Sequence, residues 1–208
     1  MNKAEKLKAI AQQITSCQQC PLYKTATNPV PGGLNPNAQI VFIGEAPGYW
    51  EDQKGIPFCG AAGNLLDKLL AEINLAREDV FIGNILKHRP PNNRDPSPEE
   101  IVACTPYLKQ QLLIIEPKII ITLGRFAMNY FIPNTYISKI HGQIKKINWE
   151  GLSLTLMPVF HPAAALRRGE FMQSLKGDFL KIPEIIDQLE QEENQPPPPP
   201  KPTQESLF

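Results

Sequence analysis

The 208-residue sequence lacks a long apolar run and carries no formal net charge, with 21 basic and 21 acidic residues. A membrane-spanning helix needs ~20 consecutive apolar residues, so a membrane protein is not expected. Residues 1–13 form a charged amphipathic pattern without the apolar core of a secretory signal, which predicts a cytoplasmic protein. Balanced charge gives no bulk attraction for nucleic acid. Any DNA contact would therefore have to come from local basic clusters.

Cysteine is also scarce, with four residues in the chain. In a reducing compartment four cysteines are not expected to form a disulfide framework, which leaves metal binding or simple burial. Cys17 and Cys20 form a C-x-x-C pair at the end of a predicted helix. Proline is abundant instead, with 22 residues. Most of the prolines lie beside the motifs described below or in the tail.

Apolar runs alternate with segments of helical periodicity along the chain. Ser97, Pro98 and Glu100 form a capping box with a proline at the first helical position. The expected strands are residues 40–43, 80–85, 119–123 and 152–159, and the expected helices are residues 4–14, 61–73, 97–113, 125–131 and 172–190. This order predicts one α/β domain over residues 1–190, a three-layer α/β/α sandwich around a central, mostly parallel four-stranded sheet. The functional residues should then lie on loops at the carboxyl ends of the strands.

Five motifs in order carry a family resemblance. Gly44-Glu45-Ala46-Pro47-Gly48 follows the first strand, and His161-Pro162-Ala163-Ala164-Ala165-Leu166-Arg167 follows the last. Between them stand Gly55-Ile56-Pro57-Phe58, Asn84 at a strand end, and Lys87-His88-Arg89-Pro90-Pro91-Asn92-Asn93-Arg94 followed by Cys104. Together they resemble the family-four, iron–sulfur members of the uracil-DNA glycosylase superfamily. A single Gly-rich turn would be weak evidence, so the order of the motifs matters most.

The resemblance implies hydrolysis of the bond between uracil and deoxyribose in DNA, with water as the nucleophile. This reaction needs a grip on an extruded base and stabilisation of the negative charge on the departing uracil. Phe58 would stack on the base, Asn84 would read its N3 and O4 edge, and His161 would donate to O2. The residues expected to be catalytic are His161, Glu45 and Asn84. Those expected to bind the base are Gly44, Ala46, Pro47, Gly48, Glu51, Phe58, Asn84 and His161.

Two acidic residues have different expected roles. Glu45 would contact the base or position the attacking water, because Ala46 stands where the best-known branch of the superfamily has an aspartate. Glu51 would crowd the C5 position of the base and so exclude thymine.

Contact with single- and double-stranded uracil-containing DNA is expected from a basic loop and from the segment after His161. Leu166 would fill the gap left in the base stack, and the basic residues would hold phosphates. The expected DNA-binding residues are Lys87, Arg89, Arg94, Leu166, Arg167 and Arg168.

The resemblance also implies a 4Fe–4S cluster. The ligands would be Cys17, Cys20, His88 and Cys104, with His88 where the family pattern has its third cysteine. Three thiolates and one imidazole also suit zinc, and the remaining alternative is that His88 only contacts DNA phosphate and the cluster is labile or lost. Cys59 is expected in the pocket wall. In each case the metal would be structural, pinning the N-terminal segment to the basic loop.

Two other functions stay open at this stage. One is a superfamily member that binds uracil-DNA covalently through a histidine, for which His88 is the candidate. The other is a non-catalytic, metal-containing DNA-binding adaptor. Whatever the function, a monomer is the starting expectation for this protein.

Residues 191–208 have a different composition and are expected to form a disordered tail. Pro196 to Pro200 form a polyproline spacer. Gln204, Leu207 and Phe208 resemble the short peptide by which bacterial repair proteins dock on the replication sliding clamp.

Deletion of residues 204–208 should abolish capture of the protein by the immobilised sliding clamp, because the docking side chains are lost. Uracil excision from short oligonucleotides should not change, since these residues lie outside the expected domain. Clamp capture that survives the deletion would refute the docking role.

Overall fold

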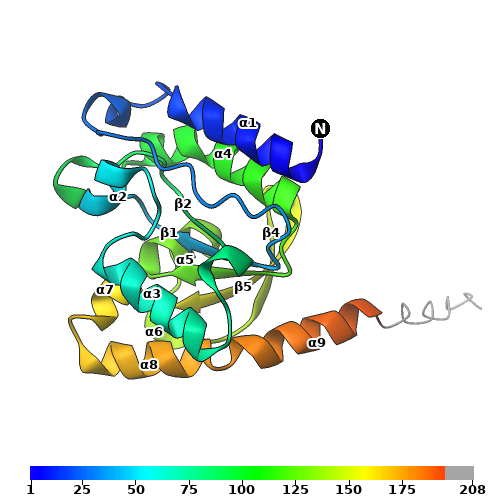
Figure 1. Ribbon diagram of the computed structural model, residues 1–208. Helices are drawn as coiled ribbons and strands as arrows, with labels where there is room; N and C mark the ends of the chain where they lie inside the picture. The colour runs from blue at the N-terminus through cyan, green and yellow to red at the C-terminus, as the bar shows by residue number, and fades with distance from the viewer. Residues whose placement is uncertain (195–208) are drawn as a thin grey trace, which may run out of the picture.

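The computed structural model describes residues 1–194, which fold into a five-stranded sheet between two layers of helices (Figure 1). The strand order is β2-β1-β3-β5-β4. The pairs β2·β1, β1·β3 and β3·β5 are parallel, and β4 runs antiparallel to β5. The strands are β1 (Ile40–Gly44), β2 (Phe81–Asn84), β3 (Ile119–Leu123), β4 (Lys145–Trp149) and β5 (Leu152–Val159).

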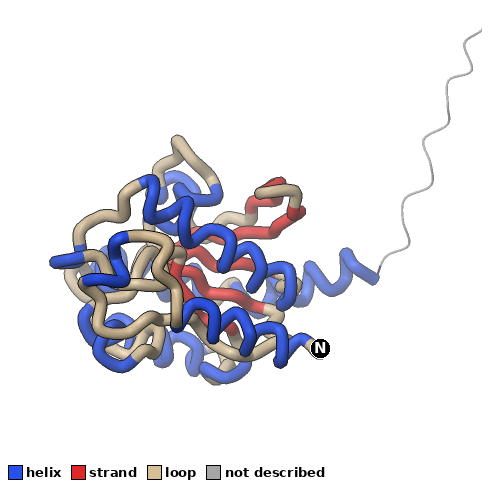
Figure 2. The backbone as a smooth tube through the Cα atoms, turned by 90° about the horizontal axis from the view of Figure 1, so that it is seen from above, coloured by secondary structure: helices blue, strands red, loops and turns tan. Residues whose placement is uncertain are grey.

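Helices cover both faces of the sheet, so the strands lie between helices in Figure 2. Side chains of α3, α8 and α9 pack on one face, and side chains of α1, α4 and α5 pack on the other. The helices are α1 (Lys3–Thr15), α2 (Tyr49–Lys54), α3 (Ala61–Glu72), α4 (Pro98–Ile115), α5 (Arg125–Phe131), α6 (Ile137–Ile140), α7 (Pro162–Ala165), α8 (Gly169–Phe179) and α9 (Ile182–Asn194). Short 3-10 turns occur at Pro21–Lys24, Arg77–Asp79 and Pro91–Asn93. None of the described helices is both long and apolar enough to cross a bilayer.

The predicted α/β order and the mostly parallel sheet are confirmed. Every residue of β1, β2 and β3 is buried, as expected for parallel strands covered on both faces. The capping box of α4 is present, with the Ser97 side chain accepting from the Glu100 backbone N–H. The loops that follow these strands are therefore held by a rigid core.

The predicted count of four strands is wrong, because β4 adds a fifth at the sheet edge. Its residues alternate between partly buried and exposed positions, and two are lysines, so it is not a continuous apolar run. Glu150 and Gly151, both with positive φ, form the two-residue turn to β5. The predicted last helix is also wrong in extent, since α8 ends at Phe179 and α9 begins at Ile182, with Pro183 in its first turn.

Strand order places a crevice at one end of the sheet. From β1 the chain continues to β2 on one side and later returns to β3 on the other side. In parallel sheets, ligands bind where this reversal separates the loops at the carboxyl ends of the strands. The proposed clamp peptide, with Gln204, Leu207 and Phe208, lies outside the described residues.

Candidate active site

Gly44, at the end of β1, is where the predicted base-binding residues come together. In the parallel pairing Gly44 stands opposite Asn84 at the end of β2. A Cβ at Gly44 would collide with Asn84 Oδ1 and would lie 2.8 Å from the Phe58 ring. Phe58 reaches this position from the loop after α2 with a positive φ of 49°. The glycine therefore leaves room for an amide and an aromatic ring to meet at one point.

The orientation of the Asn84 amide is fixed by Glu51 on α2. Asn84 Nδ2 donates to Glu51 Oε2 at 2.9 Å, and Asn84 is 1% exposed. Burial raises the pKa of Glu51, while hydrogen bonds from the Phe58 backbone, Asn84 and the Gly48 backbone lower it. A carboxylate oxygen can only accept, so it holds the NH₂ end of the amide toward itself. Asn84 Oδ1 and the second N–H remain for another partner.

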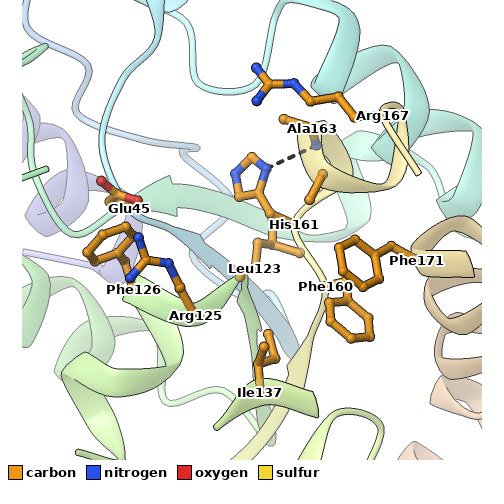
Figure 3. A pocket seen from close by; sticks show the side chains of 12 residues that line it. Glu45, Leu123, Arg125, Phe126, Ile137, Phe160, His161, Ala163, Arg167 and Phe171 are labelled. Atoms are coloured by element: carbon orange, nitrogen blue, oxygen red, sulfur yellow. Dashed lines mark hydrogen bonds between the residues drawn. The ribbon is translucent and has the colours of Figure 1, made fainter. Parts of the chain in front are cut away.

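His161 follows β5 and caps the short helix α7. Its Nδ1 accepts from the Ala163 backbone N–H at 3.0 Å, so in the neutral ring Nε2 carries the proton (Figure 3). Burial and, to a smaller extent, the charge of Arg167 lower the pKa of His161 to about 4. The ring stacks on Phe58 with centroids 5.7 Å apart. His161 is thus a neutral N–H donor beside the Phe58 ring.

A cavity of about 470 Å³ opens beside His161 at the carboxyl ends of β1, β3 and β5 (Figure 3). Neither Phe58 nor Asn84 lines it, so it adjoins the meeting point at Gly44 and does not include it. The cavity is lined by Glu45, Leu123, Gly124, Arg125, Phe126, Ile137, Phe160, His161, Ala163, Ala164, Arg167 and Phe171. Sequence reasoning missed Arg125, Phe126, Phe160 and Phe171, although Arg125 stands two positions after a buried strand.

Glu45 lines this cavity, and its side chain lies near Arg125 and Phe126 in Figure 3. Burial, together with the charge of Asp95 and against the opposing charge of Arg125, raises the pKa of its carboxyl to about 7. A carboxyl that titrates near neutrality is suited to accept a proton from water.

Gly124 lets the β3 and β5 loops approach each other. Its φ is +90°, and an added Cβ would lie 2.9 Å from the Cβ of His161. Its N–H donates to the Val159 carbonyl at 2.8 Å. A side chain here would displace His161.

Lys87 does not have the exposed position expected of a DNA contact. Its side chain is 1% exposed, and Nζ donates to the Asn84 carbonyl at 2.8 Å and to Gln111 Oε1 at 2.9 Å. Gln111 in turn donates to the Pro31 carbonyl at 2.8 Å. This burial corrects the prediction that Lys87 contributes to a basic surface. It holds the main chain at Asn84 instead.

The other predicted DNA-binding residues are partly or fully exposed. Arg89 is half-buried, and Arg94 is exposed but makes a two-point ion pair with Glu100 at 2.6 and 2.9 Å. Leu166, Arg167 and Arg168 are exposed at the end of α7, next to His161 in sequence. Their contacts with DNA stay predictions.

The predicted metal ligands lie away from the cavity beside His161, around α1, α4 and the loop that follows β2. Cys20 and Cys104 share a buried cluster with Leu22 and Leu86, whereas Cys17 packs against α1 and Tyr107. His88 and Cys17 line one small cavity of about 210 Å³. Burial raises the pKa of Cys20, and that of Cys104 to about 11, so a metal would have to displace these protons.

The predicted ligands therefore fit a metal in the kinds of donor atoms they offer and in lying in one region of the molecule. Three thiols and an imidazole suit an iron–sulfur group. Among residues 1–194, no three or more His, Cys, Asp or Glu side chains are already gathered closely enough to hold a metal ion. Cys59 stands apart from this set, and burial and the charge of Glu51 raise its pKa; its expected pocket-wall position stays a prediction.

Comparison with known proteins agrees with this geometry. Residues 31–181 match the model of the uracil DNA glycosylase superfamily. The chain is 48% identical over 186 residues to a type-4 uracil-DNA glycosylase of Archaeoglobus fulgidus, which covers 87% of this chain and 94% of the relative. It is 46% identical to a type-4 enzyme of Saccharolobus solfataricus, over 88% of this chain and 87% of the relative. The chain therefore belongs to the type-4 uracil-DNA glycosylases of the uracil-DNA glycosylase superfamily.

Proposed function

We propose that the protein hydrolyses the N-glycosidic bond of uracil in DNA and leaves an abasic site. The observation that carries this proposal is that Asn84 and Phe58 meet at Gly44, with His161 stacked on the Phe58 ring beside the cavity that Glu45 lines. An extruded base bound there would meet an aromatic wall, an oriented amide and a neutral N–H donor. Enzymes that act on a base must take it out of the helix into such a pocket.

The Asn84 amide accounts for uracil recognition. With Nδ2 held by Glu51, Oδ1 can accept from uracil N3–H and the second Nδ2 hydrogen can reach O4. Cytosine presents the opposite pattern at both positions, so it would leave buried polar groups unpaired. Glu51 thus acts on specificity through Asn84. Its expected crowding of the C5 position remains a prediction.

His161 provides charge stabilisation at the opposite edge of the base. Its Nε2–H would donate to uracil O2 as the bond to the sugar breaks and the base takes the electron pair. The neutral ring suits this role: because its pKa is about 4, the imidazole stays uncharged at physiological pH and keeps its one proton on Nε2. A preorganised donor of this kind typically contributes about 3 kcal/mol.

Glu45 would position the attacking water and take its proton. The residue lines the cavity that adjoins the proposed base-binding residues, and the sugar would lie there. Ala46 offers no carboxylate, so Glu45 is the acidic group of this loop. Oxocarbenium character on the sugar would also be favoured by a nearby carboxylate.

The central test is excision of uracil from a single-stranded oligonucleotide, read as strand breaks after alkali. His161→Ala should lower the rate about 10²–10³-fold because one preorganised donor is lost. Asn84→Ala should also impair excision, and melting temperatures of both variants verify that they fold. If neither variant changes the rate, a non-catalytic adaptor is favoured instead.

The same samples on a denaturing gel test the covalent alternative. A hydrolase gives no shifted protein–DNA band. The structure disfavours covalent capture, because His88 is buried beside Cys17 and does not line the His161 cavity.

The pH dependence of the excision rate should reflect the ionisation of the Glu45 carboxyl. A general base acts when deprotonated, so the rate should rise with pH through about 7. Glu45→Gln should abolish this rise. Arg125→Gln should move the midpoint to higher pH, because loss of the positive charge favours the protonated carboxyl. An unchanged profile in Glu45→Gln would exclude the base role. Between pH 5 and 9 His161 adds no rise or fall, since its pKa of about 4 lies below this range.

We also propose that Cys17, Cys20, His88 and Cys104 hold a 4Fe–4S group. Such a group would contribute structure, joining the segment after α1 to α4 and to the loop that carries Arg89. The three thiols and His88 come from segments that these contacts already bring to one neighbourhood.

Iron and sulfide analysis of anaerobically purified protein tests the ligand set. His88→Cys should keep the iron, since it supplies the thiolate of the family pattern, whereas His88→Ala should lose it. Cys59→Ala is the matched control and should retain it. Zinc in place of iron and sulfide would support the zinc alternative.

A further inference from the structure

Two aromatic side chains stand exposed at the start of α2, directly after the first signature loop. Tyr49 is 50% exposed and Trp50 is 57% exposed. Single exposed apolar residues are normal, but here two aromatic rings adjoin each other. Neither residue has a role in the reaction described above.

The two rings and Arg89 form a defined arrangement. The rings meet edge to face with centroids 5.1 Å apart. The Arg89 guanidinium lies 5.2 Å from the centre of the Tyr49 ring, and its Nε donates to Asn93 Oδ1 at 2.7 Å. These three residues are called the aromatic rim below. Arg89 comes from the loop after β2, so the rim joins two loops of the base site.

Contacts behind Trp50 keep the rim next to the base pocket. A Cβ at Gly60 would be 3.4 Å from Trp50 Cδ1, so the indole lies against the loop two residues after Phe58. The next residue of α2 is Glu51, which holds the Asn84 amide. The rim is thus continuous with the residues that would read the base.

The chemistry of the rim favours unpaired nucleotides over protein or lipid. Aromatic faces and guanidinium planes stack on bases without regard to sequence, and Arg89 also offers charge to a phosphate. With 21 basic and 21 acidic residues, the chain gains little from overall attraction to phosphates. Base stacking would supply binding that does not depend on net charge.

We propose that Tyr49, Trp50 and Arg89 stack an unpaired nucleotide that flanks the extruded uracil. This rests on the proposed function and deepens it, because it names single-stranded or locally opened DNA as the preferred substrate. Bases in an intact duplex are stacked on their neighbours and are not free to bind the rim. The enzyme would therefore gain more from the rim on a single strand.

Tryptophan fluorescence gives a direct measure of this contact without catalysis. The chain has two tryptophans, and Trp149 is 8% exposed, packed beside Phe131. A single-stranded oligonucleotide carrying a stable abasic analogue should quench Trp50, and Trp50→Phe should remove most of the quenching. The same strand in a duplex should quench less. Absence of quenching in the wild-type protein would overturn the proposal.

Kinetics on uracil-containing substrates provide the second test. Trp50→Ala and Tyr49→Ala should each raise KM on single-stranded DNA by roughly 5- to 150-fold, from about 1–3 kcal/mol per stacked base. The effect on kcat and on duplex substrate should be smaller, and Trp50→Phe should recover most of the loss. Leu180→Ala, which removes a side chain 61% exposed at the end of α8, is the control and should change neither constant.

The outcomes separate this proposal from the proposed function. An unchanged KM in both alanine variants, or an equal rise on single strand and duplex, contradicts the rim as a single-strand contact. Failure of the wild-type protein to excise uracil would instead contradict the glycosylase function, and quenching by the abasic strand would still report the rim.

Discussion

The hydrogen bond from Asn84 Nδ2 to Glu51 Oε2 is the interaction on which the proposed uracil specificity would depend. An amide can present its oxygen or its nitrogen to a ligand, and the two orientations read opposite bases. Glu51 settles the choice from a helix that begins directly after the signature loop. The pairing of β1 with β2 brings Gly44 beside Asn84, and the glycine leaves the space that this arrangement needs. The strand pairing, the glycine of the signature loop and helix α2 thus together fix the position and orientation of the Asn84 amide.

Burial then suits the two catalytic candidates, His161 and Glu45, to different roles. It disfavours the charged form of each, so His161 stays a neutral donor and Glu45 titrates near neutrality. Nearby charges adjust both groups: Arg167 adds to the effect on His161, and Arg125 restrains the effect on Glu45. A donor for a developing anion and an acceptor for a water proton can therefore work at the same pH.

Sequence alone predicted the parts of the fold that depend on continuous burial. The runs at β1 and β3 are apolar throughout, and the capping box of α4 is local, so both could be recognised. The edge strand β4 could not, because one side of it faces solvent and its lysines hide the pattern. The hydrogen-bond partners of the site residues also could not be predicted from sequence. Lys87 in a motif rich in arginine suggests a phosphate contact, and only the packing of α4 against the loop after β2 explains why it points inward.

The buried Lys87 also explains how the cysteine neighbourhood can matter to a site that it does not enter. An ammonium whose two side-chain hydrogen bonds go to uncharged oxygens is costly to bury, and burial lowers the pKa of Lys87 to about 8, so those contacts must be well formed. Lys87 holds the Asn84 carbonyl, while His88, the next residue, lies beside Cys17. Successive residues of one loop thus contact Asn84 and the cysteines, and Lys87 also lies next to Cys104. A group that fixes His88 would restrict Lys87 as well, and through it the strand end that carries Asn84. Structural ligation on one side of this loop would in this way help preorganise the recognition of uracil on the other.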